Sequence, residues 1–261
     1  MSTALVTGPT SGIGEAFARR LASDGYDLVL VARDAERLAA LATEFTGLGI
    51  NAEVMVVDLG DRADLARVES RLADDERPVE VLVNNAGFAL NQDFIGGSVD
   101  REQAAIDVMV TAVMRLTHAV LPGMRSRRGG LVINVSSIAS FLPFGTYSAA
   151  KSWVTSFSQG VASELMGTPV QVIAVCPGLV RTQFHARAGM DMTKTGAWMW
   201  LSTEQVVEQA FVDARRGKVI SVTGSQYRAL AAGTHLIPRD VVRRLQRFRR
   251  HRVGSEELLD D

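Results

Sequence analysis

The chain has little of several residue types, and each shortage excludes a class of protein. A single cysteine, Cys176, cannot form an internal disulfide, which favours a reducing compartment. The 28 basic and 29 acidic residues nearly cancel, which argues against a mainly electrostatic nucleic-acid binder. No apolar run approaches the roughly 18 residues of a membrane span, and the first residues do not resemble a signal peptide. The four histidines are scattered, and none has a metal-ligand spacing with Cys176. We therefore expect a soluble, cytoplasmic protein that binds no metal.

What the chain does have is a regular alternation of short apolar runs and helical patterns. Strands are expected at 4–7, 28–31, 53–57, 79–83, 131–135, 170–175 and 218–222, and helices at 13–23, 35–48, 61–75, 101–125, 147–166 and 202–216. The strands are apolar without alternation, so both of their faces should be covered. Repeated β-α units of this kind predict an α/β fold with a doubly wound parallel sheet between two helix layers.

Three glycines follow the first expected strand and lead into the first helix. Gly8 allows a tight turn, Gly12 lets backbone amides approach a pyrophosphate, and Gly14 lets the helix pack close to the strand. The N-terminus of that helix favours phosphate through its free N–H groups and its dipole. The pattern favours dinucleotide binding, and the alternative is a tight turn that binds nothing. The cofactor-binding segment would comprise Gly8, Thr10, Ser11, Gly12, Ile13 and Gly14.

The end of the second expected strand bears on which dinucleotide binds. An acidic residue there would bond the 2′-hydroxyl of NAD, whereas an arginine would accept the 2′-phosphate of NADP. The sequence is Val31-Ala32-Arg33, with no acid to repel a phosphate. Arginine suits phosphate by its geometry as well as its charge. We therefore expect NADP(H) rather than NAD(H), and the alternative is that Arg33 is only a solvated surface residue.

Further motifs occur in a fixed order along the chain. They are Thr7–Gly14, Asp58-Leu59, Asn84-Asn85-Ala86-Gly87, Asn134-Val135-Ser136-Ser137, Tyr147-Ser148-Ala149-Ala150-Lys151 and Pro177-Gly178-Leu179-Val180-Arg181-Thr182. These segments resemble the short-chain dehydrogenase/reductase family over residues 3–222, both in their order and in their spacing, which is nearly the family's. The resemblance implies a seven-stranded Rossmann-type sheet, a nicotinamide cofactor, and oxidation of an alcohol or reduction of a carbonyl. We expect a dinucleotide-binding and catalytic domain at 1–222 and a C-terminal extension at 223–261.

The resemblance also implies roles for individual positions. Asp58, followed by Leu59, would meet the adenine ring, and Thr182 would lie near the nicotinamide carboxamide. The residues that would line the adenosine ribose or flank the nicotinamide are Asn85, Ala86, Gly87, Pro177, Gly178, Val180 and Thr182.

Tyr147 and Lys151 are four residues apart in a helical stretch, so they share one helix face. A free tyrosine has a pKa of about 10, and a nearby ammonium lowers it toward the working pH of a general acid/base. Tyr147 would exchange a proton with the substrate oxygen, and Lys151 would also bond the nicotinamide ribose. A serine hydroxyl would hold and polarise that oxygen. Ser136 and Ser137 are both candidates, and we prefer Ser137, which matches the second serine of the family motif.

Two departures from the family pattern bear on activity. Ser137 precedes Tyr147 by ten residues, whereas the family's serine usually lies twelve or thirteen residues before the tyrosine. Met109 occupies the position where the family usually has an asparagine that holds a water in a proton relay. Methionine bonds water poorly, so proton resupply should be slower or use another route. The alternative is that Met109 simply fills the core.

The substrate should be apolar, because apolar side chains dominate the segments around the expected site. These are Phe88, Phe141, Leu142, Phe144 and the segment 184–200, which should act as a lid. Steroid, fatty-acyl and aromatic ketones all remain possible. A basic amphipathic helix at 239–252 could bind a membrane surface or a partner, although a packed surface helix is the simpler interpretation. By resemblance we also expect a homodimer or homotetramer formed through the helices at 101–125 and 147–166.

Two further functions remain open alongside an NADP(H)-dependent carbonyl reductase. One is a 3-oxoacyl thioester reductase, in which Arg127, Arg128 or Arg181 would steer an acidic carrier. The other is an NADP(H)-binding sensor with impaired catalysis, which Met109 favours and the pair Tyr147 and Lys151 opposes.

Overall fold

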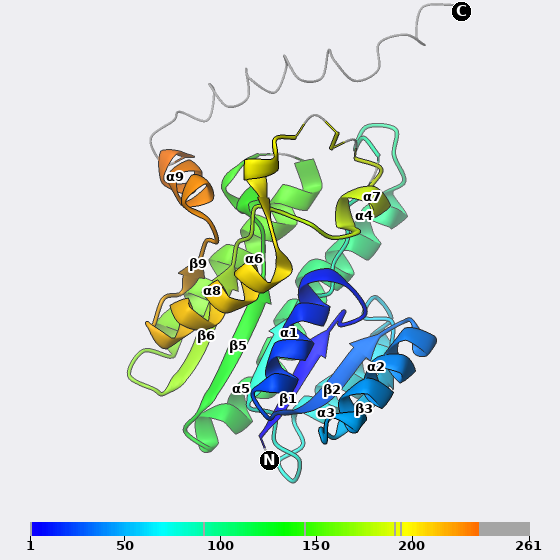
Figure 1. Ribbon diagram of the computed structural model, residues 1–261, viewed down its shortest axis with the longest axis vertical. Coiled ribbons are helices and arrows are strands. Elements are labelled where there is room, and N and C mark those ends of the chain that lie inside the picture. Colours follow the sequence, from blue (N-terminus) through cyan, green and yellow to red (C-terminus); the bar gives the residue numbers. More distant parts are fainter. Residues whose placement is uncertain (1, 91, 144, 191, 194, 235–261) are drawn as a thin grey trace, which may run out of the picture.

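The computed structural model describes residues 2–90, 92–143, 145–190, 192–193 and 195–234. Seven parallel strands form one sheet in the order β3-β2-β1-β4-β5-β6-β9, which confirms the expected Rossmann-type architecture (Figure 1). The strands are β1 (Thr3–Thr7), β2 (Asp27–Ala32), β3 (Ala52–Val56), β4 (Val81–Asn84), β5 (Gly130–Val135), β6 (Val170–Val175) and β9 (Ile220–Ser221).

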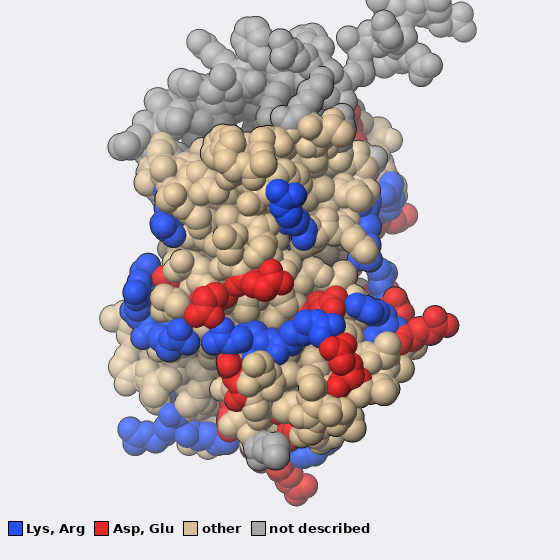
Figure 2. Space-filling view, in the orientation of Figure 1, with Lys and Arg blue, Asp and Glu red and all other residues tan. Residues whose placement is uncertain are grey.

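Helices cover the two faces of this sheet. One layer contains α1 (Gly12–Ser23), α2 (Ala35–Gly47) and α8 (Thr203–Arg215), and the other contains α3 (Arg62–Leu72), α4 (Val99–Ile106), α5 (Ala112–Ser126) and α6 (Gly145–Glu164). Successive residues of a strand point to opposite faces. Ala4 and Val6 therefore pack with the first layer, and Leu5 packs with the second. Figure 2 shows opposite charges interleaved across the front layer, which includes the ion pairs Arg19–Glu44 and Arg20–Glu208.

The expectation that every apolar strand is covered on both faces is wrong for β3. Val54 is 37% exposed and Val56 is 44% exposed. Both residues lie on an edge strand, with β2 as the only neighbour in the sheet. An apolar run at the edge of the sheet therefore does not mean a strand covered on both faces.

The single helix expected at 101–125 is interrupted by a π-helical turn at Asp107–Thr111. The helical stretch Val99–Ser126 is long and apolar enough to cross a membrane by length and composition, although no uninterrupted apolar run marks it in the sequence. Leu116, Val120 and Met124 on α5 are fully buried in the core beneath the sheet. This stretch therefore packs as a core helix of the domain.

Tyr227 anchors the segment that follows β6. It lies on α9 (Ser225–Thr234), and its hydroxyl accepts a hydrogen bond from Leu179 N at 3.0 Å and donates one to Met199 O at 2.6 Å. These contacts hold the small sheet of β7 (Leu179–Val180) and β8 (Trp200–Leu201). Tyr227 is 3% exposed, so the start of the expected extension belongs to the core. The basic helix expected at 239–252 lies outside the described residues.

We predict that Tyr227→Phe lowers the free energy of unfolding by about 1–3 kcal/mol, because it leaves a buried backbone N–H and a carbonyl unpaired. Chemical denaturation measures the change. Tyr26→Phe is the matched control, since no hydrogen bond of the Tyr26 hydroxyl occurs among the described residues. Equal losses in the two variants would contradict the anchoring role.

Candidate active site

The predicted site residues gather at one edge of the sheet. Parallel strands all end at the same edge, and ligands of doubly wound sheets bind there, where the strand order reverses. Here the reversal lies between β1 and β4. The glycine-rich turn follows β1, the segment 85–87 follows β4, and Ser136 follows β5. Three motifs far apart in sequence thus meet beside one crevice.

The glycine-rich turn needs glycine at the three expected positions. Gly8 and Gly12 have φ of 66° and 61°, in the left-handed region that favours glycine. A Cβ on Gly14 would lie 2.1 Å from the Gly8 carbonyl oxygen and 2.3 Å from Asn85 Nδ2. Helix α1 therefore approaches the turn as closely as its backbone permits.

Asn85 holds this turn from the neighbouring strand. Its side-chain amide donates hydrogen bonds to Thr7 O and Gly8 O, both at 3.0 Å. Thr7 Oγ1 in turn accepts from the backbone N–H groups of Asn85 and Ala86, at 2.9 and 3.0 Å. The Asn85 side chain thus bonds the protein backbone, where the resemblance implied a place along the ribose. Thr7 was not predicted individually as a functional position, although its place at a strand end beside Gly8 is a signal for it.

The N-terminus of α1 fits a phosphate. Side chains of Asp34, Asp61, Ser98 and Ser202 cap α2, α3, α4 and α8, whereas Ser11 makes no capping hydrogen bond at α1. The first N–H groups of α1 therefore remain available to an anion, with a favourable helix dipole. Together with the glycine cradle, this arrangement suits the pyrophosphate of a dinucleotide.

Arg33 and Asp58 come together beyond the ends of β2 and β3. Arg33 Nη1 lies 3.7 Å from Asp58 Oδ2, and the Arg33 side chain is 73% exposed. Both line a cavity of about 320 Å³ with Phe88. Asp100 and Asp107 also line this cavity, and neither was predicted from the sequence because they come from α4 and the π turn. Leu59, by contrast, is buried in the core.

The structure distinguishes the two candidate serines. The Ser137 side chain lies close enough to the phenol of Tyr147 to lower its pKa, and it begins a short 3₁₀ helix (Ile138–Phe141) by accepting from Ala139 N at 3.1 Å. Ser136 faces α6, where its Oγ donates to Lys151 O at 2.8 Å and lies 2.7 Å from Thr155 Oγ1. The hydroxyl of Ser137 is therefore the one that faces the tyrosine.

Burial controls the protonation of Tyr147 and Lys151. Loss of hydration raises the pKa of Tyr147 to about 12, and the Ser137 side chain offsets this only in part. The same effect lowers the pKa of Lys151 to about 8. Lys151 Nζ donates to Val135 O at 2.8 Å and lies 5.9 Å from the centroid of the Tyr147 ring. Our expectation that Lys151 lowers the pKa of Tyr147 is thus not met in this structure, because desolvation of the phenolate outweighs the distant ammonium.

Met109 lies beside the same lysine. It is 2% exposed, sits within the π turn, and packs with Ala105, Ala150 and Tyr147. A Cβ on Gly87 would lie 3.3 Å from Met109 Cγ and 3.5 Å from Lys151 Nζ. A thioether therefore occupies the space next to Lys151 and Gly87. The simpler interpretation, in which Met109 fills the core, is also supported by this packing.

A buried polar network supports the strands beneath the site. Asn84 Nδ2 donates to Asn134 Oδ1 at 2.9 Å and to Thr117 Oγ1 at 3.2 Å, and Asn134 Nδ2 donates to Ser158 Oγ at 3.0 Å. The network links β4, β5, α5 and α6, and each member is at most 3% exposed. The motifs contained both asparagines, but only the tertiary fold shows that they bond one another.

Aromatic side chains form the wall opposite the glycine-rich turn. The Phe184 ring, on α7 (Phe184–Arg187), lies 5.8 Å from the Tyr147 ring, and His185 contacts Trp200 edge to face at 5.3 Å. Phe88 and Tyr147 both pack against the small cluster of Ala105, Met109 and Ala150. Thr182 lies near Gly12, since a Cβ on Gly12 would be 3.0 Å from its methyl group. Phe144 lies outside the described residues.

Three further predicted positions have structural roles. A Cβ on Gly178 would lie 2.1 Å from the Tyr227 ring. The Pro177 carbonyl accepts from Ile138 N at 2.8 Å, and Val180 is 4% exposed. These residues shape the segment that carries Thr182.

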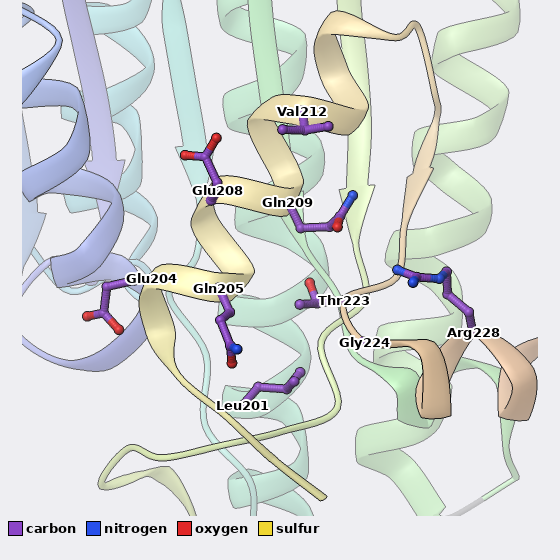
Figure 3. A pocket seen from close by; sticks show the side chains of 9 residues that line it. All are labelled: Leu201, Glu204, Gln205, Glu208, Gln209, Val212, Thr223, Gly224 and Arg228. Carbon is purple, nitrogen blue, oxygen red and sulfur yellow. The ribbon is translucent and has the colours of Figure 1, made fainter. Parts of the chain in front are cut away.

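Two other features lie away from this site. Arg127 and Arg128 follow α5 at the opposite edge of the sheet, where Arg127 pairs with Asp75, so they are too remote to steer a substrate to Tyr147. A cavity of about 530 Å³ lies between α8 and α9, and none of the predicted site residues lines it. Figure 3 shows Glu204 and Glu208 pointing away from Thr223 there. Within the described residues, no cluster of histidine, cysteine and acidic side chains could hold a metal ion.

The chain belongs to the short chain dehydrogenase family, whose model matches residues 2–193. Among curated proteins it is 38% identical over 180 residues to the NADP-dependent 3-hydroxy acid dehydrogenase of Salmonella typhi, covering 67% of this chain and 71% of that protein. The protein is therefore an oxidoreductase that acts on CH–OH or C=O groups.

Solved structures agree with this assignment. A short-chain dehydrogenase from Sphingobium yanoikuyae in complex with NADPH is 32% identical with a TM-score of 0.81, covering 100% of this chain and 99% of that one. A bulky-bulky ketone specific alcohol dehydrogenase from Comamonas testosteroni is 26% identical with a TM-score of 0.76, covering 100% and 97%.

The lowered pKa of Lys151 predicts that stability rises with pH above about 8. The folded-state pKa of about 8 lies below the ordinary value of 10.5, so between these values the unfolded chain holds a proton that the folded chain has released. Stability then increases with pH. From pH 8 to 9, the free energy of unfolding should rise by about 1 kcal/mol more in the wild type than in Lys151→Met.

Urea unfolding at each pH measures this difference. Burial also raises the pKa of Cys176, which opposes the trend, but that thiol is present in both proteins. Parallel pH dependences would show that Lys151 titrates as an ordinary lysine.

Proposed function

We propose that this protein is an NADP(H)-dependent reductase of an apolar ketone, with Tyr147 as general acid and Ser137 and Lys151 as its partners. The closeness of the Ser137 hydroxyl to the phenol of Tyr147, which partly offsets the raised pKa of that phenol, carries the proposal. It places two proton-bearing oxygens side by side at the crevice that the glycine-rich turn borders. A substrate oxygen bound there would meet a fixed donor and an acid together.

Several observations support NADP(H) as the cofactor. The glycine cradle and the uncapped N-terminus of α1 suit a pyrophosphate. Exposed Arg33 is available to a 2′-phosphate, and a structural neighbour and a curated relative are described with NADPH and NADP. Asp58, Ala86, Gly87 and Thr182 would line the remaining length of the cofactor. When bound, NADP(H) supplies or accepts the hydride.

The protonation state of Tyr147 favours reduction. A pKa of about 12 keeps the phenol protonated near neutral pH, so it can donate its proton to the carbonyl oxygen as charge develops there. Ser137 holds the same oxygen. Lys151, with a pKa of about 8, can exchange protons near neutrality and can return one toward the tyrosine. The apolar surface of Met109 beside it makes that return slow.

The character of the walls supports an apolar substrate. Phe88, Phe184 and Trp200 surround Tyr147 or its neighbours with aromatic surface. The neighbour from Comamonas is described as specific for bulky ketones. A hydroxy acid is a second candidate, because the Salmonella relative is named for one and because Arg181, 5.8 Å from the Trp200 ring, offers a cation near this wall.

Reduction of a carrier-bound thioester and a purely sensory role have less support. Of the three arginines expected to steer an acidic acyl carrier, Arg127 and Arg128 lie at the wrong edge of the sheet, which leaves Arg181. A sensor without catalysis would not need the contact between Ser137 and Tyr147. We keep a homo-oligomer and a cytoplasmic location as proposals. Exposed Val99, Ile106 and Met114 on α4 and α5 support the first.

We predict that Tyr147→Phe lowers turnover about 10²- to 10⁴-fold, the usual contribution of a general acid, while NADPH still binds. NADPH oxidation is followed with bulky aromatic ketones, 3-oxo acids and 3-oxoacyl thioesters. Tyr26→Phe is the control and should keep full activity. Turnover only with oxo acids would replace the apolar substrate by the second candidate, and NADPH binding without any turnover would favour the sensor.

We predict that Met109→Asn raises the turnover number, because an amide can hold a water beside Lys151 where a thioether cannot. Met109→Leu is the matched apolar control and should leave turnover unchanged. Urea unfolding checks that the buried amide has not unfolded the protein. Unchanged turnover in a folded Met109→Asn would show that this position does not limit proton resupply.

A further inference from the structure

Arg187 is an arginine at the mouth of the site that was not predicted from the sequence. It ends α7, the short helix whose Phe184 ring packs on Tyr147. Its guanidinium reaches across to the glycine-rich turn, where Nη1 donates to Ser11 Oγ at 3.4 Å. On its other side Nη2 donates to Gln183 Oε1 at 2.6 Å. Gln183 thus orients the guanidinium toward the N-terminus of α1.

Arg187 differs from the other arginines near the turn in the acidic groups that surround it. Arg37 donates to Thr10 O at 3.3 Å, but Glu15 neutralises it at 3.2 Å. Arg33 has Asp58 nearby at 3.7 Å. Within the part of the chain that the structure describes, no carboxylate lies within ion-pair distance of Arg187.

The contact with Ser11 is a weak one for a guanidinium. Arginine forms its strongest hydrogen bonds with carboxylates and phosphates, through two parallel N–H groups, and a neutral hydroxyl at 3.4 Å offers little of this. Ser11 is the residue before α1, whose N-terminal amides lack a side-chain cap. A guanidinium without an acidic partner among the described residues therefore stands beside amides without a side-chain acceptor.

We propose that Arg187 binds the pyrophosphate of NADP(H) from the substrate side, opposite the backbone amides of α1. This proposal rests on the cofactor-binding function proposed above. The consequence reaches the substrate site, because Arg187 and Phe184 belong to the same short helix. Binding of the phosphates by Arg187 fixes α7, and with it the aromatic wall beside Tyr147. Arg187 is then a residue that joins the cofactor site to the substrate site.

Calorimetric titration without substrate tests this proposal and needs no turnover. Three ligands separate the phosphates: NADPH, 2′-phospho-ADP-ribose, which keeps the pyrophosphate, and 2′-AMP, which lacks it. Arg187→Met should bind the first two about tenfold more weakly, as expected for loss of a charge-assisted hydrogen bond, and should bind 2′-AMP as the wild type does. Arg187→Lys should lie between, because it keeps the charge and loses the fork. Arg216→Met, an exposed arginine at the end of α8, is the matched control and should bind all three normally.

Other outcomes would overturn the proposal in distinguishable ways. Unchanged affinity for NADPH in Arg187→Met, together with a lower melting temperature of the free protein, would make the contact with Ser11 purely structural. An equal loss for 2′-AMP would place Arg187 at the 2′-phosphate. Failure of the wild type itself to bind NADPH would overturn the proposed function, and the role of Arg187 with it.

Discussion

The fold and the site both depend on the close approach of α1, at Gly14, to the turn that follows β1. An added Cβ there would lie 2.1 Å from a carbonyl oxygen of the turn and 2.3 Å from the amide of Asn85, so no side chain larger than hydrogen fits. The contact brings the N-terminus of α1 to the ends of β1 and β4 in one place. Because all seven strands are parallel, the segments after β5 and β6 end at the same edge. The close approach at Gly14 and the parallel order of the strands thus bring the glycine-rich turn to the same end of the sheet as the tyrosine and the serine.

Burial has opposite consequences for the two titratable groups of this site. It keeps the proton on Tyr147 and favours its loss from Lys151, because each group is uncharged in the form that burial prefers. The backbone carbonyl of Val135 and the hydroxyl of Ser137 satisfy the polar atoms that remain. In the proposed reaction this favours donation of a proton from the tyrosine, and a bound anionic cofactor would favour the charged form of the lysine.

The sequence allowed the architecture to be predicted, and it placed the candidate site motifs at the ends of strands, where the structure brings them together, because strand-end motifs follow from local pattern. Glycine spacing marked the turn, and the spacing of Tyr147 and Lys151 marked one helix face. The π turn, the exposure of β3 and the anchor at Tyr227 could not be predicted, since each depends on neighbours distant in sequence. The raised pKa of Tyr147 could not be predicted for the same reason. Proximity to a lysine suggested a lower value, and only the tertiary fold shows how much hydration the phenol loses.

Lysine and arginine occupy different kinds of position along the chain. The chain has twenty-five arginines and three lysines. Arginine keeps its proton at any physiological pH and binds through a planar fork, which suits ion pairs on helix surfaces and phosphates. Lysine can lose its proton and offers a compact donor. Lys218 pairs with Asp213 near the sheet edge, whereas Lys151 is buried beside Tyr147. Under the proposed function, the chain would place a deprotonatable cation where a proton moves, and arginines such as Arg33 and Arg187 where a fixed charge is enough.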